Sequence, residues 1–197
     1  MKVEYNSQRD NFSFAGKFKA WSQCFSTNTW MLISYWLKQP CTDAGLRDYV
    51  EAVELQVGHG RIAKRVLAWA KWITGFTSLW WLVQKEAIME YLAKIPGKAV
   101  FRENDGTWDE VSEALKQGPV IIGTSGLPGL RGGHIVLIVG ETGDGLQWIV
   151  HDPFGDATGA YTNANGESVL YPKEWFKRFT ENVTGRPGKI RIMYFIQ

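Results

Sequence analysis

The chain of 197 residues has a hydrophobic fraction of 45% and a charged fraction of 21%, which is ordinary for a soluble globular protein. We expect a single domain over residues 1–197, and a chain of this length buries a sizeable core without disulfide bonds. The net charge of +2 gives no electrostatic reason to expect nucleic-acid binding.

The N-terminal residues 1–20 alternate loosely and predict an extended lead-in. They contain no apolar run of signal-peptide length, so we expect synthesis in the cytoplasm without export. Residues 24–38 predict a helix that ends before Pro40, with one apolar face formed by Trp30, Ile33, Trp36 and Leu37. A second helix is expected over 43–56, capped by Thr42 or Asp43 and broken by "VGHGR".

Further helices are expected over 61–73 and 84–94, and they overlap a Trp-rich stretch at 66–83. This stretch is long enough to span a bilayer, but it is interrupted by Lys71, Thr74, Gly75, Thr77 and Ser78. We therefore expect a buried helix and turn, with a membrane-surface segment as the rival interpretation and no stable membrane insertion. Adjacent Trp80 and Trp81 cannot both enter one core easily, so we expect at least one of them to contact the substrate.

The second half of the chain is rich in strands. After a turn and short strand in "PGKAVF", a helix is expected in "TWDEVSEALKQG", with Thr107 as its cap. Strands are then expected over 119–125, 133–141, 147–155 and 189–197. Helices followed by a mostly antiparallel sheet indicate an α+β fold. We expect a helical lobe at about 20–117, a sheet lobe at about 118–197, and the site between them.

Cys24 stands at the start of the first predicted helix, where unpaired N–H groups and the helix dipole favour a thiolate. A disulfide with Cys41 is disfavoured, because the helix alone is about 20 Å long and a disulfide needs Cα atoms within about 7 Å. With three histidines and neither a CxxC nor an HExxH motif, the sequence argues against a metal site. A buried, inert cysteine remains the main alternative to a nucleophile.

His134 opens a predicted strand, and Asp152 ends the next one. The connection "ETGDG" predicts a hairpin with Asp144-Gly145 at its tip, which pairs His134 with residue 153 or 154. Cross-strand neighbours have Cβ atoms about 5 Å apart, so the sequence predicts an imidazole–carboxylate contact. Together with Cys24 this makes a nucleophile, a base and a group that orients the base.

Two other histidines compete weakly for the role of base. His151 precedes Asp152 directly, so the two side chains point to opposite faces of the strand. His59 lies in "GHG", where we expect a solvated loop, and we expect Cys41 to be structural.

The chain resembles papain-like cysteine peptidases of the family-39-like group, which includes bacteriocin leader-processing peptidases and phage-encoded proteins. The segments that carry the resemblance are "YNSQRDN" (5–11), "CFSTNTWMLISYW" (24–36), "GGHIVLIVGE", and "VHDPFGD" (150–156) followed by "GAY", "NG" and "LYPKEWFKRF". They cover residues 5–38 and about 115–180, and the set in this order is fairly specific.

The resemblance implies a papain-like fold and a Cys-His-Asp site that needs no cofactor or metal. Cys24 would be the nucleophile, His134 the base and Asp152 the orienting group. Gln8 would donate to the oxyanion hole, in competition with Gln23. Gly133, beside the base, would leave room for the substrate.

The sequence departs from the group in three respects, and the last of them bears on the substrate more than on the chemistry. Phe25 replaces the usual small residue after the nucleophile, and the gap from Gln8 to Cys24 is longer than in papain itself. Residues 57–83 match nothing in the group.

The predicted function is amide hydrolysis by a thiol peptidase, and a phage enzyme that cuts peptidoglycan is the most specific version. Such an enzyme would reach the cell wall during lysis or as a virion component. The alternatives are a protein-processing protease, an acyl transferase, a binding module without activity, and a membrane-active protein that uses 66–83. We expect a peptide or peptidoglycan partner and a monomer, although the sequence leaves the oligomeric state open.

Overall fold

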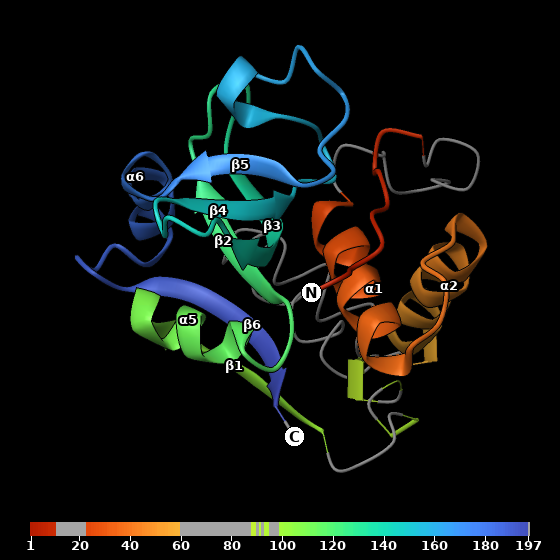
Figure 1. Ribbon diagram of the computed structural model, residues 1–197. Helices are drawn as coiled ribbons and strands as arrows, with labels where there is room; N and C mark the ends of the chain where they lie inside the picture. Colours follow the sequence, from red (N-terminus) through yellow and green to blue (C-terminus); the bar gives the residue numbers. More distant parts are fainter. Residues whose placement is uncertain (11–22, 60–87, 90, 92, 95–98, 197) are drawn as a thin grey trace.

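Local sequence signals start and stop the main elements. The computed structural model describes residues 1–10, 23–59, 88–89, 91, 93–94 and 99–196. Its helices are α1 (Cys24–Leu37), α2 (Asp43–His59), α5 (Trp108–Leu115), α6 (Lys173–Thr184) and the short 3-10 helix η3 (Ala157–Gly159) (Figure 1). Its strands are β1 (Val100–Gly106), β2 (Val120–Ser125), β3 (Gly133–Glu141), β4 (Gln147–His151), β5 (Val169–Pro172) and β6 (Ile190–Ile196).

The six strands form one sheet in the order β1-β6-β2-β3-β4-β5, and each neighbouring pair is antiparallel. The predicted α+β class and antiparallel sheet are therefore confirmed. Side chains of a strand alternate between its two faces. In β3, Leu137 and Val139 enter one hydrophobic core, whereas Val136 and Ile138 enter another. The central strands are thus buried on both faces.

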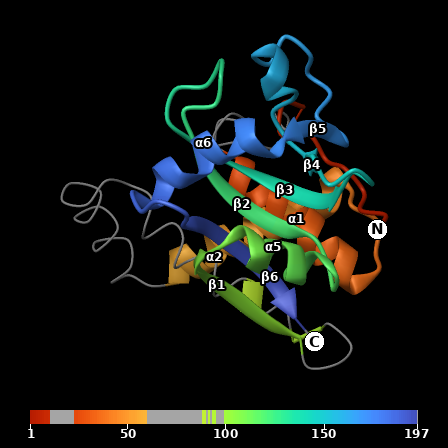
Figure 2. The ribbon, with the colours of Figure 1, turned by 60° about the vertical axis from the view of Figure 1, so that its left-hand side comes forward.

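Helices cover both faces of the sheet. On one face α1 packs against β3 and β2, and α2 packs against α1; Met31 and Leu32 of α1 are fully buried there. On the other face α5 and α6 pack against the sheet, where Val111 and Phe176 are buried. Figure 2 shows α5 and α6 in front of the sheet and α1 behind it. The sheet is the middle layer of three.

Several elements differ from the sequence expectation. Helix α6 was not predicted, although Gly185, in the left-handed conformation at φ 64°, ends it as a helix-stop glycine does. Helix α2 continues to His59, so the expected solvated loop at that residue is wrong. Strand β4 ends at His151 rather than at 155, because Pro153 has no N–H for a ladder. The predicted helix over 61–73, the Trp-rich stretch at 66–83 and most of 84–94 lie outside the described residues.

Residues 1–10, here called the N-terminal segment, bind to the end of β4. The Nε2 atom of His151 lies 2.9 Å from the carbonyl oxygen of Val3, and the Gln8 N–H donates to the Pro153 carbonyl at 2.9 Å. The Ser168 N–H donates to Nδ1 of His151 at 3.0 Å. Nε2 therefore carries the proton and donates to Val3.

The N-terminal segment also binds Cys41 and Asp43, just before and at the start of α2. The carboxylate of Glu4 accepts the backbone N–H of Cys41 at 2.8 Å, and the Asn6 amide donates to the Asp43 carboxylate at 2.8 Å. The segment therefore joins the helices of one layer to the sheet.

Gly166 is pressed against the main chain of Asp152. The Asp152 N–H donates to the Gly166 carbonyl at 2.9 Å, and a Cβ added at Gly166 would overlap the Asp152 carbonyl oxygen. We predict that Gly166→Ala lowers the free energy of unfolding by about 2–3 kcal/mol, because rigid backbone must move to admit the methyl group.

Urea denaturation measures this effect. Gly143→Ala is the matched control, since a Cβ there meets nothing within 4 Å, and it should change the free energy of unfolding by less than about 0.5 kcal/mol. Equal stability of the two variants would contradict the described contact.

Candidate active site

Cys24 is the first residue of α1, at the positive end of the helix. No acidic residue lies in the first turn, and the N-cap residue Gln23 makes no side-chain capping bond. The first N–H groups of a helix lack intrahelical partners and favour a negative charge. Cys24 is partly exposed, whereas the ten residues after it are buried. Its thiol is therefore partly accessible and lies at the positive end of the helix.

His134, the second residue of β3, joins the other two predicted members of the site. Its Nε2 atom lies 2.7 Å from Oδ1 of Asp152, and a hydrogen bond joins its ring to the Cys24 thiol. Because Nε2 is taken by Asp152, Nδ1 is the nitrogen that faces the thiol. The structure thus brings Cys24, His134 and Asp152 into one hydrogen-bonded chain.

The hairpin register explains the contact between His134 and Asp152. The ladder pairs Leu137 with His151 and Ile138 with Val150. If this register is continued along both strands, His134 lies opposite residue 154, which is one of the two positions expected from the hairpin turn. The predicted imidazole–carboxylate contact is confirmed by the 2.7 Å distance.

The Asp152 carboxylate is fully buried and accepts four hydrogen bonds. Oδ1 accepts from His134 and from the Phe154 N–H at 2.9 Å. Oδ2 accepts from the hydroxyl of Tyr161 at 3.1 Å and from that of Tyr171 at 2.8 Å. Two donors on each oxygen are what an ionised carboxylate accommodates. Sequence analysis missed both tyrosines as partners of Asp152.

The imidazole of His134 is held in its charged form. Burial lowers its pKa, but the charge of Asp152, the hydrogen bond to Asp152 and the contact with Cys24 raise it, and the result is a pKa of about 10. An imidazolium near neutral pH stabilises a neighbouring thiolate. The geometry therefore suits a thiolate–imidazolium pair between Cys24 and His134.

Aromatic rings enclose the His134–Asp152 pair. The rings of Phe154 and Tyr161 stand edge-on to the imidazole, with centroids 6.3 and 6.1 Å away. The guanidinium of Arg9 lies over Phe154 at 4.3 Å and donates to the Tyr161 carbonyl at 3.1 Å. This cover keeps His134 at 4% exposure, and low exposure to water strengthens the electrostatic pairing.

Asn28 ties the helix of the thiol to the strand of the imidazole. Its Nδ2 group donates to the Cys24 carbonyl and to the Ile135 carbonyl, each at 2.7 Å. The Thr124 hydroxyl donates to the His134 carbonyl at 3.1 Å from the neighbouring strand. These bonds set the spacing between Cys24 and His134, and the sequence analysis assigned no role to either polar residue.

The remaining predicted site residues that the structure describes are Gln8, Gln23 and Gly133, and they differ in exposure. The Gln8 side chain is buried, and its backbone lies beside Pro153, next to Asp152. Gln23, its rival, is also buried. Gly133 is exposed at the start of β3. Trp80 and Trp81 lie outside the described residues, so their predicted substrate contact stays a prediction.

The rivals for the catalytic roles occupy structural positions. His151 uses both ring nitrogens to bind backbone at Val3 and Ser168, and burial lowers its pKa. Cys41 is a buried free thiol, and its pKa is raised to about 12 by burial. Cys24 is free as well, so the two cysteines are not joined. Within the described part of the chain, no three metal-ligating side chains converge.

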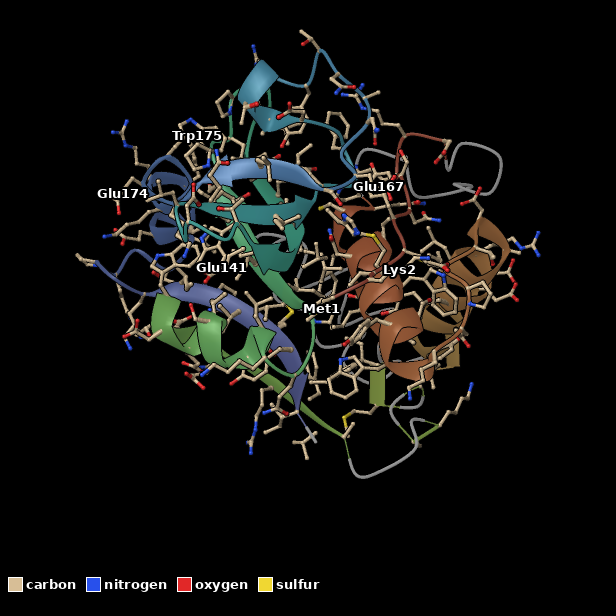
Figure 3. The ribbon with its side chains drawn as sticks, viewed as in Figure 1. Met1, Lys2, Glu141, Glu167, Glu174 and Trp175 are labelled. Carbon is tan, nitrogen blue, oxygen red and sulfur yellow. The ribbon has the colours of Figure 1, made fainter. Side chains whose placement is uncertain are left out.

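Open cavities of about 890 and 810 Å³ lie among the described residues, away from Cys24. The first is beside the C-terminal half of α1, and the second lies between the N-terminal segment and strands β3 to β5. Lys2 lines both, and Met1, Glu141 and Glu167, labelled with it in Figure 3, line the second. Cys24, His134 and Asp152 line neither cavity.

Comparison of the chain with protein-family models, with curated proteins and with solved structures found no match. Among the helices that the structure describes, none has the length and hydropathy to cross a bilayer. The assignment of a function therefore depends on the site itself.

The two cysteines should differ strongly in reactivity. We predict that iodoacetamide modifies Cys24 rapidly near neutral pH and Cys41 slowly, because Cys24 is partly exposed beside an imidazolium, whereas Cys41 is buried. Peptide mass mapping of briefly treated native protein measures both rates. Faster modification of Cys41 would show that the thiol environments are wrongly described.

His134 and His151 should affect the pH dependence of stability with opposite signs. The pKa of His134 is raised from 6.5 to about 10, so its contribution is complete below pH 6.5 and is lost as pH rises through 10. The pKa of His151 is lowered from 6.5, so its contribution is complete above that pH and is lost on further acidification.

Denaturation of wild type, His134→Gln and His151→Gln at pH values from about 5 to 10 tests both signs. The difference between wild type and His134→Gln should shrink between pH 6.5 and 10. The difference for His151→Gln should stay constant there and change only below pH 6.5. A His134 difference that grows with pH would be incompatible with an imidazolium held by Asp152.

Proposed function

We propose that the chain is a thiol hydrolase with a papain-like fold, which cleaves an amide bond through Cys24, His134 and Asp152. The observation that carries the proposal is the 2.7 Å bond from His134 to a buried carboxylate, on a ring that also bonds the thiol at a helix N-terminus. Nucleophile, base and orienting group are related in this way in enzymes that form acyl intermediates. The contact of α1 with β3 agrees with a nucleophile helix packed on the sheet of the histidine.

The reaction begins with the thiolate of Cys24 and the imidazolium of His134. The sulfur attacks the amide carbonyl carbon, and the carbonyl oxygen becomes an oxyanion. We assign its stabilisation to the side-chain amide of Gln8 and the backbone N–H of Cys24, since preorganised donors are effective at a developing negative charge.

Collapse of this intermediate breaks the C–N bond. His134 gives its Nδ1 proton to the leaving amine, and a thioester remains on Cys24. His134 then takes a proton from water, and the hydroxide attacks the thioester. Loss of the thiolate releases a carboxylic acid, while the proton stays on His134.

Asp152 keeps the imidazole in the required orientation throughout. Its Oδ1 atom accepts a hydrogen bond from the Nε2–H group of His134, so Nδ1 always faces the sulfur of Cys24. The buried negative charge also stabilises the imidazolium. No step needs a metal or cofactor.

For the substrate we propose the stem peptides or cross-bridges of peptidoglycan, with the enzyme reaching the cell wall during phage lysis or as a virion component. The resemblance of the motifs to phage-encoded proteins supports this choice.

A zymogram on purified peptidoglycan, run beside a casein digest, tests the proposed substrate. Clearing of peptidoglycan alone supports a lysin, and digestion of casein alone supports a protein-processing protease. Mass spectrometry of the product distinguishes hydrolysis from acyl transfer, because hydrolysis leaves a free carboxylate.

The two cysteines provide a matched pair of variants. We predict that Cys24→Ala abolishes amide hydrolysis with little loss of stability, since the side chain is small and partly exposed. Cys41→Ala should keep most of the activity and lose some stability, because Cys41 is buried among core residues.

Turnover on the zymogram substrate and thermal melting measure both properties. Full turnover by Cys24→Ala would show that Cys24 is not the nucleophile and that a different site performs the hydrolysis.

A further inference from the structure

Two tyrosine hydroxyls converge on one oxygen of Asp152. Tyr161 comes from the turn after η3, and Tyr171 comes from β5. Their hydroxyls lie 3.1 and 2.8 Å from Oδ2, the oxygen that does not face His134. Both tyrosines are buried, and the hydroxyl of each donates to the carboxylate of Asp152.

We propose that Tyr161 and Tyr171 are positioning residues that hold the Asp152 carboxylate turned toward His134. The inference rests on the proposed function, because it assigns the tyrosines a role in the same reaction. They act through Asp152 and His134 on the thiolate of Cys24.

The Tyr171 hydroxyl has its proton directed at Asp152. Its oxygen accepts the backbone N–H of Ala157 at 3.1 Å, and Oδ2 of Asp152 lies 2.8 Å away. Because the Ala157 N–H can only donate, the hydroxyl proton is left for the carboxylate. Burial and the charge of Asp152 raise the pKa of the hydroxyl, so it remains a donor across the working pH range.

Tyr161 reaches Asp152 from a strained backbone. Its φ is 63°, and that of Ala160 is 51°, so two consecutive non-glycine residues are left-handed. Residues in this conformation are strained, and they persist where surrounding contacts fix them. The contacts here are the Arg9 guanidinium at 3.1 Å from the Tyr161 carbonyl and the bond of the Tyr161 N–H to the Asp156 carbonyl at 2.8 Å. The strained turn places the Tyr161 hydroxyl within hydrogen-bond distance of the Asp152 carboxylate.

Removal of the hydroxyls should alter the charge distribution of the site. A buried carboxylate that loses donors becomes a stronger proton acceptor. The proton shared with His134 then moves toward Asp152, and the imidazole loses positive charge. The thiolate of Cys24 loses its counterion, so a higher pH is needed to form it.

The experiment measures the rate of Cys24 alkylation by iodoacetamide from pH 4 to 10, followed by peptide mapping. This readout needs no substrate, and a purely structural tyrosine would not move its midpoint. The variants are Tyr161→Phe, Tyr171→Phe and the double variant, which keep the ring volumes. Asp152→Asn is the reference for complete loss of the carboxylate charge.

Tyr194 provides a matched control. Its hydroxyl donates to the Glu110 carboxylate at 3.0 Å, away from the site. Phenylalanine at this position removes the same group without changing the donors on Oδ2 of Asp152.

We expect the alkylation midpoint to rise by about one pH unit in each single variant, since a hydrogen bond to a charged group has this magnitude. The double variant should shift further toward Asp152→Asn, and Tyr194→Phe should leave the midpoint in place. Thermal melting and circular dichroism show which variants fold. If the double variant does not fold, the single variants test the positioning role.

The outcomes separate the two proposals. If Asp152→Asn moves the midpoint and folded tyrosine variants do not, the positioning role is wrong and the proposed function stands. If Asp152→Asn itself leaves the midpoint unchanged, the triad is wrong, and the tyrosine proposal fails with it. A midpoint shift in Tyr194→Phe equal to that in Tyr161→Phe would also overturn the positioning role.

Discussion

The buried carboxylate of Asp152 is the constraint on which the arrangement of the site depends. An ionised group at 0% exposure is stable only when its oxygens are fully hydrogen-bonded. Its donors come from four places: strand β3, the turn of Phe154, the turn of Tyr161 and strand β5. The main chain of Asp152 also binds Gly166 and the Tyr5 hydroxyl. The segments that carry these donors are distant in the sequence. They must therefore adopt the one arrangement in which every donor reaches the Asp152 carboxylate.

The site spans the boundary between two layers of the structure. Strand β3 supplies His134 and the residue after β4 is Asp152, while α1, which packs against the sheet, supplies Cys24. Asn28 bonds both elements through one amide group, and the N-terminal segment bonds both layers through Glu4 and Val3. The proposed reaction requires that the side chains of the site be held within fractions of an ångström, and these cross-layer bonds provide that restraint.

The sequence predicted those parts of the site that follow from local rules. The strand period of two and the hairpin tip placed Asp152 within about two residues of the position opposite His134, and the helix start placed Cys24 at a helix N-terminus. Tyr161 was not predictable in this way, because its direction depends on two left-handed residues and on contacts with the distant Arg9. The role of Asn28 likewise depends on β3 lying against α1, which no local pattern indicates. Helix α6 was missed because its apolar residues were interpreted only as part of a family resemblance.

The position of β6 has a consequence for synthesis. This strand follows every other described element in the chain, yet it lies inside the sheet, between β1 and β2. While the ribosome is still translating the earlier segments, β1 has no neighbour and the inner edge of β2 is unpaired. The sheet closes only when β6 has emerged, because long-range strand pairing must wait for both partners. The sheet of the nascent polypeptide therefore remains incomplete until β6 inserts, and a chain whose translation stops before β6 exposes the edges of β1 and β2 that β6 would cover, which favours aggregation.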